Sequence, residues 1–198
     1  MKKLSFLFVL SAVLGLAFTN PASETVNFSV DTEASYITWR GYKVTGKHHG
    51  KVKLEDGNLE YTDGMLSGGS FTIDMSSISV EDLTGGGKEK LEGHLKSADF
   101  FGVENFPTAK FVITEVISRG KPGDYRITGD LTIKETTNEI KFNALLAENG
   151  NTTTGTAKIT LDRSEYDVRY GSGSFFDNLG DKTIYDEFDL EINLVANK

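Results

Sequence analysis

Two of the three histidines in this chain are adjacent, at His48 and His49 in the segment GKHHGKV, and the third is His94. Imidazole nitrogens bind transition metals and act as general bases near neutral pH. A metal site needs three or four ligands that converge on one point, whereas neighbouring residues of a β-strand point to opposite faces. We therefore do not expect a histidine metal site. His48 and His94 remain candidates for a catalytic base.

Other catalytic signatures are missing from the sequence. The chain has no cysteine, which removes thiol nucleophiles, disulfide bridges and a lipid-anchored N-terminal cysteine. No Gly-x-Ser-x-Gly segment is present. The run Gly85-Gly86-Gly87-Lys88 is similar to part of a phosphate-binding loop, but Glu89 follows where Ser or Thr should bind magnesium. We interpret the run as a flexible hinge.

Most of the chain from Ser35 onward alternates apolar and polar residues with a period of two, which predicts half-buried β-strands. The clearest case is Phe188, Leu190, Ile192 and Leu194, which are separated by polar residues. Turn residues between the segments indicate antiparallel pairing. We expect about eight or nine short strands, with turns at Asp56-Gly57-Asn58, Asp63-Gly64 and Asn149-Gly150-Asn151.

Strands that are apolar on one side must hide that side, so the expected architecture is a closed barrel or a two-sheet sandwich. Residues 85–99 predict a Gly-rich loop and then a short helix, with Leu91 and Leu95 on one face, over one end of the sheet. Residues 166–186 predict a long aromatic connection. The 13 Phe, 7 Tyr and single Trp can fill a core or line a cavity, and periodicity alone does not decide between the two.

The first 22 residues have the pattern of a secretory signal peptide, with Lys2 and Lys3 before a short apolar run. We therefore expect one domain at residues 23–198, in the periplasm or outside a bacterium, with no integral membrane segment after the signal is removed. The formal net charge is −8, which argues against nucleic acid as a partner. It also argues against anionic lipid surfaces, so we expect a lipid to be handed over through a partner protein. A homodimer stays open.

Three segments resemble the YceI-like, or polyisoprenoid-binding, family. The first is KVTGKHHG from Lys43, and the second, which is the most specific, is HLKSADFFGVENFPTAKF from His94. The third is ITGDLTIKETTNEIKFNA from Ile127. The resemblance spans most of residues 30–195 in family order. It departs after Leu161, where the chain is longer and more aromatic.

The resemblance implies an all-β, antiparallel, lipocalin-like barrel of about eight strands with one short helix over one end. It also implies a non-enzymatic, exported protein that holds a polyisoprenoid or another long-chain amphiphile for transport or storage, with no cofactor besides that lipid. The amphiphile would be a quinone, a polyprenyl phosphate or a fatty chain. The expected ligand-binding residues, with His48 and His94 near the head group, are Trp39, His48, Phe71, Ile73, His94, Phe101, Phe111, Ile113 and Phe142.

Two other functions remain open from the sequence. One is a hydrolase or isomerase that acts on a lipid or amide with His48 or His94 as its base. The other is a β-sandwich interaction domain in which the aromatic residues form a filled core and nothing is bound.

Overall fold

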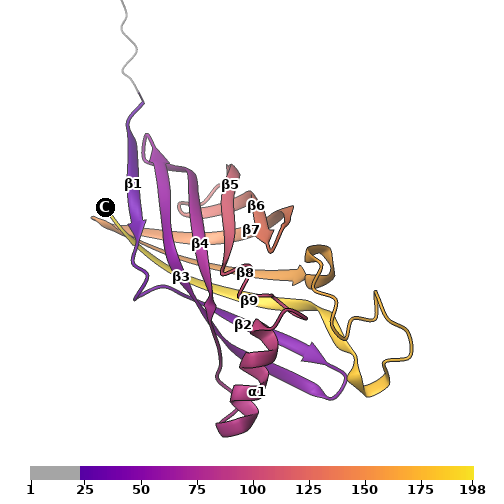
Figure 1. Ribbon diagram of the computed structural model, residues 1–198. Coiled ribbons are helices and arrows are strands. Elements are labelled where there is room, and N and C mark those ends of the chain that lie inside the picture. The colour runs from indigo at the N-terminus through magenta and orange to yellow at the C-terminus, as the bar shows by residue number, and fades with distance from the viewer. Residues whose placement is uncertain (1–22) are drawn as a thin grey trace, which may run out of the picture.

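The computed structural model describes residues 23–198, which form a closed antiparallel β-barrel with one helix at one end (Figure 1). The predicted signal peptide, residues 1–22, lies outside the described residues. The strands are β1 (Thr25–Val30), β2 (Tyr36–Lys43), β3 (Gly46–Thr62), β4 (Met65–Val80), β5 (Thr108–Ser118), β6 (Asp124–Ile133), β7 (Thr136–Asn149), β8 (Thr152–Asp162) and β9 (Ile184–Asn197). The helices are α1 (Gly85–Lys96) and the 3₁₀ turns η1 (Arg163–Tyr166) and η2 (Gly180–Lys182).

The barrel has eight strand positions because β1 and β2 share one of them. Both strands pair antiparallel with β3 and with β9, so they are two segments of one interrupted strand. At the interruption, the Ser35 hydroxyl donates to the carbonyl of Val195 at 3.1 Å and accepts from its N–H at 2.9 Å. A side chain thus replaces the missing ladder bonds. From β2 the wall continues through β9, β8, β7, β6, β5 and β4 to β3, which pairs again with β2.

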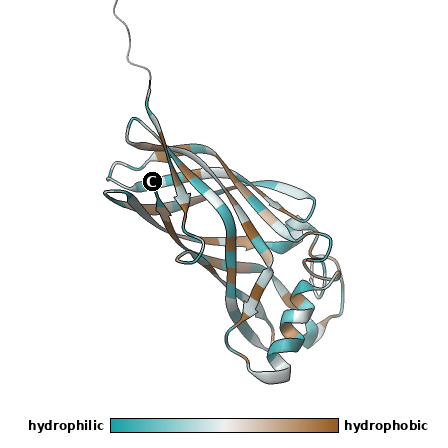
Figure 2. Ribbon diagram, turned by 60° about the vertical axis from the view of Figure 1, so that its left-hand side comes forward, coloured by the Kyte–Doolittle hydropathy of each residue, from teal (hydrophilic) through white to brown (hydrophobic). Residues whose placement is uncertain are grey.

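Closure settles the choice between barrel and sandwich in favour of the predicted barrel. Every strand position is hydrogen-bonded on both sides, and the apolar residues of the alternating pattern face inward. Figure 2 shows hydrophobic and hydrophilic residues alternating along the strands. The predicted alternation from Phe188 to Leu194 lies on β9, and all four of its apolar residues belong to the core or pack against it.

Two details of the strand prediction are wrong. Asp56-Gly57-Asn58 is not a turn but lies inside the continuous strand β3, next to a bulge at Leu54–Asp56. A Cβ on Gly57 would lie 2.8 Å from the Phe71 ring and 3.0 Å from the Ser70 carbonyl oxygen, so glycine here serves close packing. Strand β1 was not expected. Val26, Phe28 and Val30 do alternate with polar residues and pack in or against the core, but this short strand lies before Ser35, where the expected alternation begins.

The run Gly85–Gly87 is also not a loop, because it forms the first turn of α1. The helix is otherwise as expected. It packs on β4 at one end of the barrel, where the Glu92 carboxylate accepts the Val80 N–H at 2.8 Å and Leu95 is buried. Among residues 23–198, no helix has the length and apolar character that crossing a membrane requires.

The wall divides at this same end. The ladder between β7 and β8 runs only from Ala144–Ala157 to Asn149–Thr152, so the remaining parts of the two strands, residues 136–143 and 158–162, separate toward the α1 end (Figure 1). The Asn138 side chain bridges this fork by donating to the Glu165 carbonyl at 2.9 Å. The predicted long connection follows η1, although its last residues already belong to β9.

Candidate functional site

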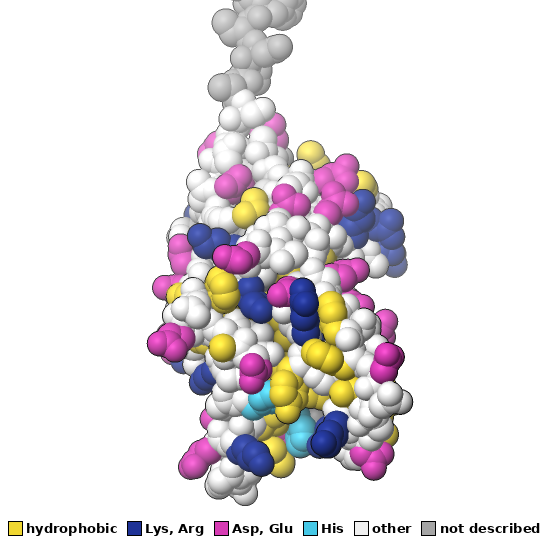
Figure 3. All heavy atoms as spheres, turned by 45° about the vertical axis from the view of Figure 1, so that its right-hand side comes forward, with side chains coloured by type: hydrophobic (Ala, Val, Ile, Leu, Met, Phe, Trp, Pro, Cys, Tyr) yellow, Lys and Arg dark blue, Asp and Glu magenta, His cyan; other side chains and the backbone are white. Residues whose placement is uncertain are grey.

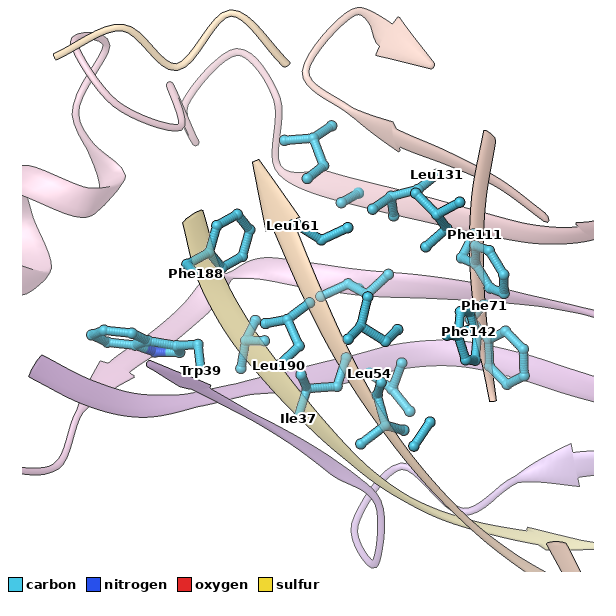
Figure 4. A pocket seen from close by; sticks show the side chains of 18 of the residues that line it. Ile37, Trp39, Leu54, Phe71, Phe111, Leu131, Phe142, Leu161, Phe188 and Leu190 are labelled. Carbon is cyan, nitrogen blue, oxygen red and sulfur yellow. The ribbon is translucent and has the colours of Figure 1, made fainter. Parts of the chain in front are cut away.

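The inside of the barrel contains an elongated cavity of about 240 Å³. This volume is far larger than the roughly 10–15 Å³ that one water molecule needs. Side chains from all eight strand positions and from the α1 region line the cavity, and nearly all of them are aliphatic or aromatic. Such a surface offers an apolar guest a dry environment and few hydrogen bonds. Figure 4 shows the labelled side chains surrounding this space, with Trp39 at one end.

Three phenylalanines gather at the other end of the view in Figure 4. The ring centroids of Phe71 and Phe111 are 6.3 Å apart, and those of Phe111 and Phe142 are 5.5 Å apart. The rings come from β4, β5 and β7. Gly129 on β6 makes room for them, since a Cβ there would lie 2.5 Å from the Phe111 ring. An apolar chain that enters beside Trp39 would end against this aromatic cluster.

The structure brings seven of the nine predicted ligand-binding residues to the wall of this cavity: Trp39, Phe71, Ile73, Phe101, Phe111, Ile113 and Phe142. His48 and His94 are not among the residues that line it. Ligand contact by any of the nine residues stays a prediction.

Trp39 lines the cavity with its ring and uses its N–H elsewhere. The indole nitrogen donates to the Ser79 carbonyl at 3.1 Å, so the polar edge points into the wall. Gly50, opposite Trp39 on β3, permits this arrangement. A Cβ at that position would lie 1.7 Å from the Ser79 oxygen and 2.9 Å from the tryptophan ring. Gly50, which directly follows the two adjacent histidines, therefore allows β3, β4 and Trp39 to pack together.

His48 and His49 are neighbours on β3 and do not form a common site. His48 Nδ1 lies 2.9 Å from Asp82 Oδ2, while only the backbone N–H of His49 reaches the same carboxylate, donating to Oδ1 at 3.1 Å. Burial alone would raise the pKa of Asp82, but these contacts hold it below its usual value. The pair ties the start of β3 to the segment after β4. Among residues 23–198, no cluster of three or more His, Asp or Glu side chains is placed to hold a metal ion.

His94 lies on α1, packed edge-on between two aromatic rings. Its ring centroid is 5.4 Å from that of Phe100 and 4.4 Å from that of Tyr170. Nε2 is buried with no hydrogen-bond partner among the described residues. Burial lowers the pKa of His94, nearby Asp99 opposes this shift, and Arg163 adds to it. Through these ring contacts His94 connects α1 to the long loop after η1.

Arg163 is the one charged residue that lines the cavity within the described part of the chain, and the sequence analysis missed it. Its side chain is 3% exposed, and its guanidinium donates to the carbonyls of Tyr185, Val168 and Ile184 at 2.6–3.2 Å. It also lies 3.1 Å from Asp186 Oδ1. The period of two that places Leu161 inside also places Arg163 inside, so continuing the alternation past the end of β8 would have found it.

The cavity opens at the α1 end, and its opposite end is sealed. At the open end, where the β7–β8 ladder has stopped, Ile140 on β7 and Ile159 and Leu161 on β8 line the cavity, and so does Tyr185, which is 51% exposed. The face in Figure 3 shows hydrophobic side chains gathered in its lower half, beside the histidines. This opening gives an elongated guest a route into the barrel.

The sealed end is packed by side chains that do not line the cavity. The rings of Phe28 and Tyr61 lie 5.2 Å apart, and Thr153 and Ala196 are completely buried beside them on β8 and β9. Burial raises the pKa of Tyr61 to about 12, and Thr153 partly opposes this shift. A guest that enters at the α1 end therefore cannot leave through this end without unpacking it.

Comparison with protein families identifies the domain. The YceI-like domain profile matches residues 28–196, which is nearly all of the described chain. The chain belongs to the YceI-like family. The family assignment drawn from the three sequence segments is thereby confirmed. Among curated family relatives, a UPF0312 protein of Pseudomonas putida is 28% identical over 155 residues, covering 72% of this chain and 76% of that protein.

Solved structures share the fold with lower sequence identity. Burkholderia cenocepacia BcnA has a TM-score of 0.70 and 23% identity over 85% of this chain and 99% of that chain. A polyisoprenoid-binding domain from Saccharophagus degradans, implicated in plant cell wall breakdown, has a TM-score of 0.60 and 11% identity over 86% of this chain and 97% of that chain. These likenesses support the barrel fold of the YceI-like family in this chain.

Proposed function

We propose that this YceI-like protein is an exported carrier or store for a long-chain amphiphile, with a polyisoprenoid tail inside the barrel. The observation that carries the proposal is the apolar cavity, open at the α1 end and sealed at the other. Burial of apolar surface contributes about 25 cal/mol per Å², so a long tail is bound strongly without polar contacts. The name of the Saccharophagus degradans structure supports the isoprenoid class of ligand.

We further propose that the head group is neutral, such as a quinone or an alcohol. Arg163 is the charged residue at the cavity wall, but Asp186 neutralises it and three backbone carbonyls accept its N–H groups. A phosphate would have to displace these partners and leave the partly buried Asp186 carboxylate beside a second negative charge, which is costly. A neutral head group near Tyr185 avoids that cost.

The protein works by binding and not by turnover in this proposal. The His48–Asp82 pair lies away from the cavity wall, and His94 is packed between two rings. His48→Ala is therefore expected to leave the amount of bound lipid unchanged. Turnover of a lipid or amide that is lost in His48→Ala or His94→Ala would contradict the proposal.

The decisive experiment is organic extraction of freshly purified protein followed by mass spectrometry. We expect about one lipid per chain, with an isoprenoid tail and an uncharged head. Ala157→Phe adds a ring at the cavity wall and should abolish retention at a cost of about 1–3 kcal/mol in stability. Thr154→Phe on the same strand is exposed, does not line the cavity and is the matched control. Absence of lipid from the wild-type protein, or equal retention in both variants, would rule out the cavity as the site.

A further inference from the structure

The loop between η1 and β9 exposes large apolar side chains at the open end of the barrel. Tyr170, Phe175 and Phe176 on this loop and Tyr185 at the start of β9 are 40–51% exposed, and Val44 at the tip of the β2–β3 hairpin is 49% exposed. We call these five residues the rim patch. The hairpin and the loop are joined, because the Val44 N–H donates to the Thr183 carbonyl at 3.2 Å. Half of the exposed large hydrophobic residues of the described chain thus belong to two short connected segments.

The loop is a built structure that holds these rings in place. Ser172 is fully buried and donates to Asp186 Oδ2 at 2.9 Å, and its carbonyl accepts the N–H groups of Phe175 and Phe176. The Ile184 N–H donates to the Gly171 carbonyl at 2.8 Å. Together with the contacts of Arg163, these bonds fix both ends of the loop. An ordered loop that presents two consecutive phenylalanines to water indicates a surface that another apolar phase covers.

The rim patch is continuous with the cavity, since Tyr185 is half exposed and also lines the cavity wall. A guest with a long apolar tail has negligible solubility in water, so its exchange requires the cavity opening to face a second apolar environment. The medium that holds such amphiphiles is a lipid bilayer. Aromatic side chains with one apolar and one polar end suit the interface of a bilayer.

The charge of this end permits that approach. Residues 43–47 and 167–187 carry four basic and five acidic side chains, whereas the formal net charge of the whole chain is −8. Most of the negative charge therefore lies elsewhere on the molecule. The overall charge led to the expectation that a partner protein hands over the lipid, but this end of the barrel is nearly balanced in charge. The tip of the loop, residues 170–180, contains one charged residue, Asp177. Such a surface neither depends on anionic lipids nor is strongly repelled by them.

We propose that the rim patch docks the protein on a bilayer surface, with Phe175 and Phe176 inserted at the interface, so that lipid enters and leaves the barrel without crossing water. This inference rests on the proposed lipid-carrying function. It adds the place and the route of exchange, and it assigns a role to the segment in which the chain departs from the usual family pattern.

The test is flotation of the purified protein with phosphatidylcholine vesicles, alone or mixed with phosphatidylglycerol. We expect binding to both vesicle types, and a loss of about tenfold or more in the Phe175→Ser/Phe176→Ser variant, because two rings no longer enter the interface. Val112→Ser/Leu145→Ser removes two residues that are 47% and 59% exposed on the barrel wall and is the matched control. The control should bind vesicles as the wild-type protein does.

Lipid content, measured by extraction, separates this inference from the proposed function. The Phe175→Ser/Phe176→Ser variant should retain its lipid but transfer it between vesicles at least about tenfold more slowly. Failure of the wild-type protein to bind vesicles, or equal binding by the loop variant, overturns the docking surface even when lipid is present in the barrel. A wild-type dimer that the loop variant converts to a monomer also overturns it, because the patch would then be an interface between copies.

Discussion

The two ends of the barrel are built from the same alternating strands but are closed by different means. At the sealed end, Phe28 and Tyr61 pack ring against ring over buried residues of β8 and β9. At the open end, the strands part between β7 and β8, and Arg163 holds a long loop through hydrogen bonds to backbone carbonyls. Close apolar packing at the sealed end leaves no route for a guest. The hydrogen bonds of Arg163 at the open end order the loop without filling the space beside it.

The largest effect is expected from removing the hydrogen bonds of the Arg163 guanidinium. Arg163→Met leaves three carbonyls and the Asp186 carboxylate without their partner, and we expect a loss of about 3–5 kcal/mol in the free energy of unfolding, measured in urea. Residues 167–183 should become sensitive to protease before the barrel unfolds. Arg163→Lys retains the charge but not the forked geometry, so it should recover only part of the loss. Wild-type stability in Arg163→Met would show that the loop is held by its other contacts.

Alkaline pH should lower the free energy of unfolding, because a buried tyrosine near each end of the barrel, Tyr61 or Tyr166, would lose its proton. Burial raises the pKa of Tyr61 and of Tyr166 to about 12 from an ordinary value of 10.0. Because the pKa of each tyrosine is higher in the folded state than in the unfolded state, its protonated hydroxyl contributes to the free energy of unfolding. This contribution is fully present below pH 10 and is lost as the pH rises through about 12. The loss should be on the order of 2 kcal/mol for each tyrosine. Tyr61→Phe and Tyr166→Phe should each flatten the fall in stability between pH 10 and 12, and unchanged curves would contradict the assignment.

The same substitution at the two regions should separate stability from binding. Phe28→Leu removes the ring contact with Tyr61 and should cost about 1–2 kcal/mol without changing the amount of extracted lipid. Phe71→Leu changes the aromatic cluster at the cavity wall and should lower lipid content at a similar cost in stability. Equal lipid content in the two variants would show that the sealed end and the cavity wall do not differ in their effect on lipid binding.

The smallest effect is expected at His94. Burial lowers the pKa of this imidazole, so the unfolded chain takes up the proton first on acidification, and stability falls as the pH drops below the ordinary value of 6.5. The contribution of the uncharged His94 ring to stability is present above pH 6.5 and is lost as the pH falls through the pKa of His94 in the folded state. His94→Phe keeps an aromatic ring beside Tyr170 and should remove this pH dependence in thermal unfolding between about pH 7 and 5. The same slope in the variant would assign the acid sensitivity to other groups.

The sequence predicted the long runs of alternating strands and missed one short strand and several contacts made by single residues. The period of two placed Phe71, Phe111 and Phe142 on inward faces, and the family resemblance supplied the barrel that brings them together. In contrast, β1 is a short strand before the main run of alternation, and Gly57, in the turn-like run Asp56-Gly57-Asn58, serves close packing inside β3. Composition cannot distinguish a glycine that turns the chain from one that admits a neighbouring ring.

The candidate site shows the same division. The apolar wall follows from alternation, but the role of Arg163 depends on contacts with Val168, Ile184 and Tyr185, which a 3₁₀ turn and a long loop bring back to it. His48 and His94 were chosen because they lie in two of the segments that resemble the family, and neither is among the residues that line the cavity. Export and lipid handover remain predictions, as does the oligomeric state.

The interrupted first strand has a consequence for how the chain reaches its native state. β1 and β2 find one partner, β9, at the far end of the sequence, with Tyr36 beside Asn193 and Ser29 beside Asn197. The barrel therefore cannot close until the C-terminal strand is available, and contacts of such long sequence separation fold slowly. A chain that emerges N-terminus first carries an unsatisfied β-edge until its last residues arrive, and in that interval it is most exposed to aggregation and proteolysis.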